Sequence, residues 1–104
     1  MKADTLESLY VNQLEDLFSA ENQLLAAFPT MIDAASDASL KATLQEHAEQ
    51  TRDHVRRLEW IFEDMAVAPR EHLCQGMAGI LREGGEIIER AGDPKVRDAG
   101  LIAA

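Results

Sequence analysis

Two long segments of the sequence repeat apolar residues at alternating spacings of four and three, the repeat of a helix buried along one side. In the first segment the repeated positions are Tyr10, Leu14, Leu17, Glu21, Leu24, Phe28 and Met31. In the second segment they are Leu40, Leu44, His47, Thr51, His54, Leu58, Ile61 and Met65. No stretch shows the strict alternation or the β-branched clusters of a strand. The pattern therefore predicts an all-α protein built on two long helices.

The first of these helices is predicted to begin at Asp4 and to run to about Ala35. Asp4 can cap free backbone amides while Glu7, three residues later, completes a capping box. Pro29 lies inside the predicted helix and removes one backbone hydrogen bond. We expect a kink near this proline in a helix that otherwise continues.

Turn-forming residues and prolines divide the rest of the chain. A second helix is predicted from about Ser39 to Val67, closed by Pro69, and a third from Leu73 to Ala91. The third helix carries four glycines, so its stability depends on packing. Asp93 can cap a fourth helix, in which Pro94 takes the first position.

Both repeats contain polar residues at their centres. In an antiparallel hairpin that turns near Asp37, residues equidistant from the turn lie side by side. Glu21 precedes Asp37 by sixteen residues, so it should lie level with Asp53 and His54. Gln50 is one helical turn from His54 and borders the same region. We therefore predict a polar cluster between the two helices at half their length.

The polar cluster has two interpretations. A carboxylate and an imidazole on facing helices are ligands of iron, manganese or zinc in bundle cores, and this predicts a metal site formed by Glu21, Gln50, His54 and His47. His47 lies roughly 10 Å along the helix from His54, so the two cannot easily bind one ion. Alternatively, Glu21 and His54 form a hydrogen-bonded pair that sets the register of the helices without metal. The stripe pattern alone leaves both interpretations open.

Charge and composition exclude several classes of function. The net charge of −9 disfavours binding to nucleic acids or to anionic membranes. No apolar run approaches the roughly 20 residues that cross a bilayer. The single Cys74 cannot form an internal disulfide, which agrees with a reducing compartment. We therefore expect a cytoplasmic protein. No phosphate-binding loop or nucleophile grouping supports a hydrolase or a nucleotide-binding protein.

Three runs of residues resemble the bacterial YciE/YciF family of ferritin-like stress proteins. They are Phe18–Leu24, Cys74–Ile88 and Asp93–Ala104, and the similarity covers the whole chain. We therefore interpret residues 1–104 as a single ferritin-like domain, which is either truncated or complete. The resemblance implies a ferritin-like helical bundle. In it the first two helices form a long antiparallel hairpin, the third is a short crossover, and a further helix starts the second hairpin.

The resemblance also implies a di-metal carboxylate protein that binds iron or manganese, with Glu21 as one ligand and, if it is an enzyme, an oxidase or peroxide-consuming activity. This chain departs from the family in two ways. Gln50 stands where the family has glutamate and His54 where it has glutamine, which lowers the affinity expected for ferric iron. The family also continues beyond Ala104 with further ligands.

The missing second ligand set leaves three alternatives. The chain is a truncated member, or two subunits complete one four-helix bundle with a shared site, or the domain has lost its metal and keeps a structural role as a non-catalytic helical oligomer. Because apolar helix faces are left uncovered, we expect a homo-oligomer, with a dimer favoured.

Overall fold

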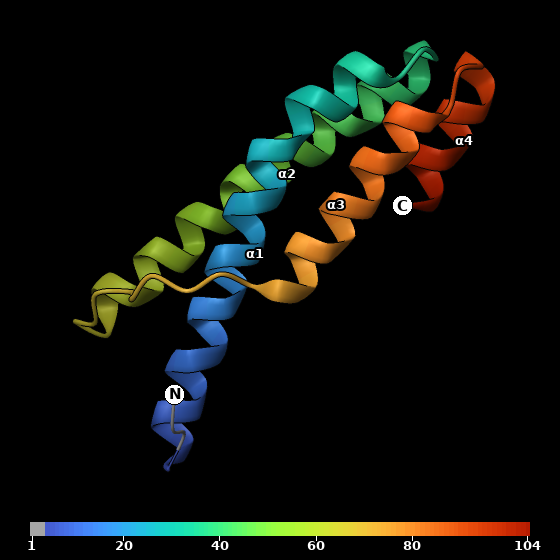
Figure 1. Cartoon of the computed structure of the whole chain (residues 1–104). Helices are drawn as coiled ribbons and strands as arrows, with labels where there is room; N and C mark the ends of the chain where they lie inside the picture. The colour runs from blue at the N-terminus through green and yellow to red at the C-terminus, as the bar shows by residue number, and fades with distance from the viewer. Residues whose placement is uncertain (1–3) are drawn as a thin grey trace.

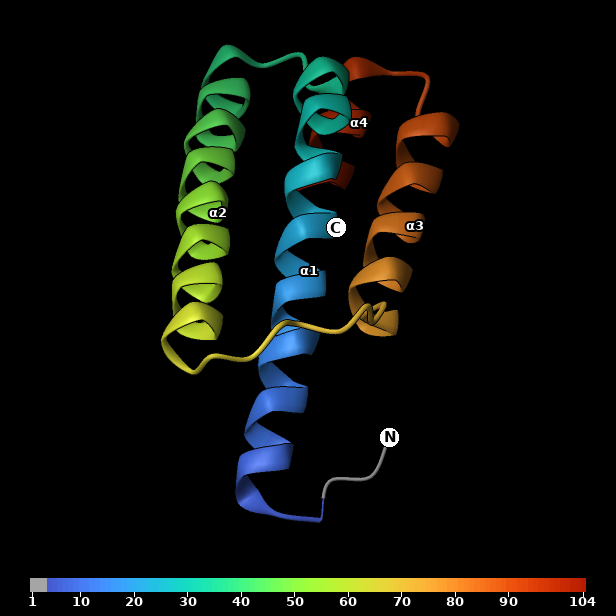
Figure 2. The ribbon, with the colours of Figure 1, turned by 90° about the vertical axis from the view of Figure 1, so that its left-hand side faces the viewer.

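The computed structural model describes residues 4–104, which form four α-helices (Figure 1). They are α1 (Leu6–Ala34), α2 (Ala38–Asp64), α3 (Gln75–Arg90) and α4 (Pro94–Ala103). No residue of this described range lies in a strand, which confirms the predicted all-α class. Viewed from the side, α1 is the central helix, with α2 and α3 on opposite sides of it and α4 behind it (Figure 2).

Three helices begin with a polar cap. The Thr5 side chain accepts a hydrogen bond from the backbone N–H of Ser8 at 3.0 Å, so Thr5 caps α1 and the predicted capping box of Asp4 and Glu7 is wrong. Thr5 has the extended backbone that a capping residue requires, which moves the start of the helix one residue along the chain. Asp37 caps α2, and Asp93 caps α4 as predicted.

The end of α2 differs from the prediction. The helix stops at Asp64 rather than near Val67, because Ala66 adopts a left-handed backbone with a φ of 54°. The N–H of Ala66 donates to the carbonyl of Glu63 and that of Val67 to the carbonyl of Phe62, each at 3.0 Å, the two bonds of a Schellman motif. This turn directs Val67 back onto the core.

The core lies between α1 and α2. Leu14, Leu58 and Phe62 are its buried centre, and Phe18, Ile61, Met65 and Val67 pack around them. The rings of Phe18 and Phe62 meet edge to face, with centroids 5.6 Å apart. Phe28 is buried nearer the turn, and the helix continues past Pro29 as predicted. The two helices therefore form the long antiparallel hairpin that the stripes predict.

The last two helices attach mainly to α1 and to each other. The Asp98 carboxylate of α4 accepts hydrogen bonds from the backbone N–H groups of Ser36 at 2.8 Å and Asp37 at 2.9 Å, so it holds α4 against the turn between α1 and α2. A Cβ atom at Gly100 would lie 2.3 Å from the Ile87 side chain, which shows how closely α3 and α4 pack.

Candidate functional site

Glu21 and His54 lie beside each other between α1 and α2. Their closest atoms, Oε1 of the glutamate and Nδ1 of the histidine, are 3.5 Å apart. The antiparallel register about Asp37 produces this contact, because it sets the middle of α1 against the middle of α2. The structure therefore brings together the two residues that the stripes placed at one height.

The two members of this pair differ in their exposure to solvent. The Glu21 side chain is 25% exposed, and its Oε2 atom is buried without a hydrogen-bond partner among residues 4–104. The His54 side chain is 48% exposed. The stripes place both residues on the sides of their helices that are predicted to be buried. This prediction is wrong for the imidazole, because no helix of the described chain covers it at this height. It holds only for one oxygen of the carboxylate.

A second buried oxygen without a hydrogen-bond partner lies on α2, near His54. Thr51 is 1% exposed, and its hydroxyl forms no hydrogen bond within the described range. It stands one helical turn before His54. Buried polar groups are nearly always paired, so two unpaired oxygens in one part of a hairpin call for an explanation.

Within residues 4–104, the other predicted ligands form no hydrogen bond or ion pair with the Glu21 carboxylate. The His47 ring packs edge to face on Phe28, with centroids 5.1 Å apart. Gln50 is exposed on α2. Within residues 4–104, no three His, Cys, Asp or Glu side chains are grouped closely enough to hold one ion. The residues present thus fit part of a metal site, one carboxylate and one imidazole, and not a complete set.

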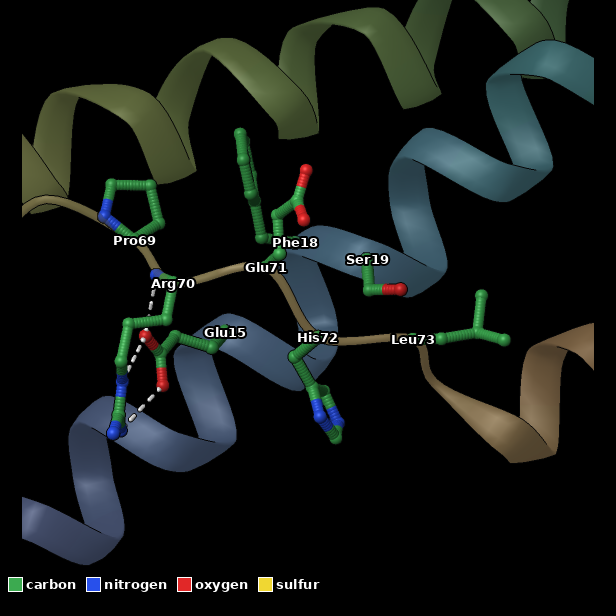
Figure 3. Close-up of a pocket in the computed structure, with 8 residues that line it drawn as sticks. All are labelled: Glu15, Phe18, Ser19, Pro69, Arg70, Glu71, His72 and Leu73. Carbon is green, nitrogen blue, oxygen red and sulfur yellow. Dashed lines mark hydrogen bonds and ion pairs between the residues drawn. The ribbon is translucent and has the colours of Figure 1, made fainter. Parts of the chain in front are cut away.

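A second polar cluster, which the sequence did not predict, fixes the segment between α2 and α3. We call residues 66–74 the strap; it crosses α1 on the side that faces the reader in Figure 2. Glu15 of α1 is 2% exposed and accepts from Arg70 of the strap through three bonds (Figure 3). Its Oε2 receives the backbone N–H at 2.7 Å and Nε at 3.2 Å, and its Oε1 receives Nη2 at 3.1 Å. Hydrogen bonds from the Arg70 side chain lower the pKa of Glu15, more than burial raises it.

Two further contacts continue along the strap. His72 Nε2 lies 2.9 Å from a carboxylate oxygen of Asp16, and the Ser19 hydroxyl accepts from the backbone N–H of Cys74 at 2.8 Å. Glu15, Ser19, Arg70 and His72 line a cavity of about 510 Å³, open to solvent (Figure 3). Their hydrogen bonds run between α1 and the strap, so the cluster fastens these two segments together. Since its partners are about 55 residues apart, no local sequence pattern could have indicated it.

Comparison with known proteins identifies relatives over the full length of the chain. The family model described as "Domain of unknown function (DUF892)" matches residues 5–104. Protein YciF of Escherichia coli K12 is 32% identical over 105 residues, which cover all of this chain and 63% of YciF. The chain therefore spans less than two thirds of that relative.

Two solved structures superpose closely on the four helices. YcfI of Rhodopseudomonas palustris has a TM-score of 0.91 at 30% identity, over 99% of this chain and 67% of that one. The E. coli stress protein YciF has a TM-score of 0.90 at 31% identity, over 97% of this chain and 64% of that one. No helix in the described range is both long and apolar enough to cross a membrane.

Proposed function

The chain belongs to the family described as DUF892, and from this premise we propose that it is a cytoplasmic stress protein of ferritin-like architecture that binds iron or manganese. Glu21 is the anionic ligand and His54 the imidazole beside it. The E. coli relative is named a stress protein, which supports the physiological setting. The proposal of metal binding is supported by the polar atoms of Glu21 and His54 in this chain.

One observation carries the proposal: the Oε2 atom of Glu21 is buried without a partner. A buried carboxylate oxygen that receives no hydrogen bond destabilises the fold by several kcal/mol unless a cation or a proton neutralises it. In proteins, an Arg or Lys side chain often supplies the positive charge beside a buried carboxylate, as Arg70 does for Glu15. A divalent cation at Glu21 would satisfy the orphaned oxygen, with the neutral imidazole of His54 as a second donor.

The chain's own residues define what such a site can do. A bound iron or manganese ion supplies redox chemistry, and the half-exposed His54 leaves that ion open to solvent and to small oxidants. One carboxylate and one neutral imidazole supply little negative charge, so the site favours divalent over ferric ions. A di-metal centre needs more carboxylates than residues 4–104 bring together.

The direct test is metal binding measured by titration calorimetry with Mn²⁺ and, under anaerobic conditions, with Fe²⁺. We expect Glu21→Gln to weaken binding more than about tenfold, because the ligand charge is lost while the shape of the side chain is kept. Glu49→Gln is the matched control, since it removes an exposed carboxylate from the same hairpin. Wild-type protein that takes up neither ion, or equal weakening by both variants, would contradict the proposal.

A structural role for the same pair is the second candidate, favoured by the exposure of His54. In this case Glu21 and His54 only set the register of α1 against α2. The double variant Glu21→Gln with His54→Leu would then fold at least as stably as the wild type. Neither metal would raise the melting temperature of the wild type, as a ligand that binds only the folded state must do.

A further inference from the structure

Two hollows border the strap where it crosses α1. The first is the cavity of about 510 Å³ that Glu15 and His72 line (Figure 3). The second, of about 390 Å³, lies between the strap and the end of α2. Phe18 and Pro69 line both hollows, so the two meet at these residues. We call the two hollows together the trough.

Apolar side chains form much of the surface of the trough. Phe18 and Val67 are half-buried, and Leu73 is 53% exposed. Phe18 and Val67 also pack against the core, so the floor of the trough is held in place without a ligand. A preformed hollow lined by half-exposed apolar side chains is typical of a surface that binds another molecule.

Three exposed carboxylates line the trough and form no ion pair with any residue in 4–104. They are Glu59 and Glu63 at the second hollow and Glu71 at the first. The other charged side chains that line it have partners, Arg70 with Glu15 and His72 with Asp16. The trough therefore carries unmatched negative charge.

Two of these carboxylates occupy positions that are unfavourable for the folded chain alone. Glu59 and Glu63 are four residues apart on α2, where like charges repel each other. Glu63 also lies in the last turn of α2, which has no basic residue, and the negative end of the helix dipole repels a carboxylate there. A cationic group bound beside them would relieve both repulsions.

The trough lies on the side of α1 opposite to α4. In Figure 2 the strap crosses in front of α1, whereas α4 lies behind it. Hydrogen bonds to Glu15 and Ser19 hold the strap on this front side. The exposure of the trough is therefore independent of what covers the α4 side of α1.

We propose that the trough binds a basic, apolar peptide segment of a partner protein. The apolar side chains of the segment lie on the floor formed by Phe18 and Pro69, and its Lys or Arg side chains lie beside Glu59 and Glu63. The net charge of −9 attracts such a segment and repels nucleic acids and anionic membranes. A peptide uses several side chains as anchors along a groove, which suits two joined hollows. This inference does not depend on metal binding at Glu21.

The proposal is tested with a fluorescent amphipathic peptide of about 12 residues, built from leucine and lysine, whose anisotropy is followed during titration with the 104-residue chain. We expect a dissociation constant of about 10–100 µM at low salt, and weaker binding as the salt concentration rises. Two control peptides carry glutamate in place of every lysine, or serine in place of every leucine. Each should bind at least about tenfold more weakly.

Matched variants of the chain locate the binding site. Glu59→Gln with Glu63→Gln should weaken binding about tenfold, because the charges beside the cationic side chains are lost. Glu46→Gln with Glu49→Gln removes the same charge from exposed positions of α2 outside the trough and should change binding less than about twofold. Leu73→Ser should weaken binding about fivefold with unchanged circular dichroism, since this side chain is half exposed.

Amide chemical shifts measured by NMR show where the peptide lies, and we expect the largest changes within residues 59–73. Equal weakening by the two double variants, or shifts spread evenly over the acidic surface, would mean that the peptide follows net charge alone and would overturn the proposal. Failure of the leucine–lysine peptide to bind, or equal binding of the serine control, overturns it as well. Self-association of the chain that Leu73→Ser abolishes would assign the trough to a second copy instead.

Discussion

Glu15 is the residue on which the position of the strap most depends. Its carboxylate is buried and accepts hydrogen bonds from both the backbone and the side chain of Arg70. Glu15→Gln removes the charge and turns an acceptor into a donor that faces the guanidinium. We expect a loss of about 1–3 kcal/mol in the free energy of unfolding, measured by urea denaturation. Asp16→Asn, which breaks the half-exposed contact to His72, should lose less than about 1 kcal/mol. Equal losses would show that burial of Glu15 contributes nothing.

The same residue makes stability depend on acid. Because the pKa of Glu15 is lower in the folded protein than its ordinary value of about 4.5, its contribution is complete above that value. As the pH falls below it, the unfolded chain takes up a proton first, and the contribution disappears as the pH passes the folded pKa. The stability difference between wild type and Glu15→Gln should therefore shrink below about pH 4. A difference that stays constant between pH 7 and pH 3 would contradict this.

Single residues were predictable only where a periodic pattern sets their position. Glu21 and His54 interrupt two regular stripes, so their common height follows from the helical repeat and the place of the turn. The bond between Glu15 and Arg70 depends on how an irregular strap crosses α1, and no repeat encodes that path. Exposure also escaped prediction: the stripe marks His54 as interior, yet a helix that would cover it is absent from the described chain.

At the scale of elements, the end of α2 stores a small amount of backbone strain. Ala66 occupies the left-handed position of the Schellman motif, which usually holds glycine and strains other residues by about 1–2 kcal/mol. After the greater freedom of glycine in the unfolded chain is subtracted, Ala66→Gly should stabilise the protein by about 0.5–1 kcal/mol. Ala68→Gly, two residues later where φ is negative, should slightly destabilise it. Urea midpoints that fall for both variants would contradict the assignment.

The same alanine explains why this boundary was predicted poorly. The four helices and their order follow from periodicity and capping residues, and the cap at Asp93 occurs as predicted. Glycine usually marks the end of a helix in a sequence, and here alanine occupies that position. The prediction therefore placed the end of the helix at the next proline, Pro69. The turn forms at Ala66 because Val67 gains a place against Phe62 and its neighbours in the core.

The buried core residues are distributed unequally between two parts of the molecule. The α1–α2 hairpin contains the buried core residues, whereas α3 and α4 contain none and pack on α1 and on each other. Stripe periodicity indicates which side of a helix is apolar but not which neighbour covers it. The arrangement of α3 and α4 around α1 was therefore beyond what the sequence alone could determine.

This inequality predicts that α3 and α4 open together before the hairpin unfolds. Few buried apolar contacts hold them, so their amides should exchange with solvent faster than those of α2. Asp98→Ala removes the two hydrogen bonds that fix α4 to the turn, and hydrogen exchange followed by mass spectrometry should then accelerate in α3 and α4 alone. Asp53→Ala, at an exposed ion pair on α2, should leave all four helices unchanged. Acceleration spread equally over α2 would mean that the chain unfolds as one cooperative unit, with Asp98 contributing to the stability of the entire bundle.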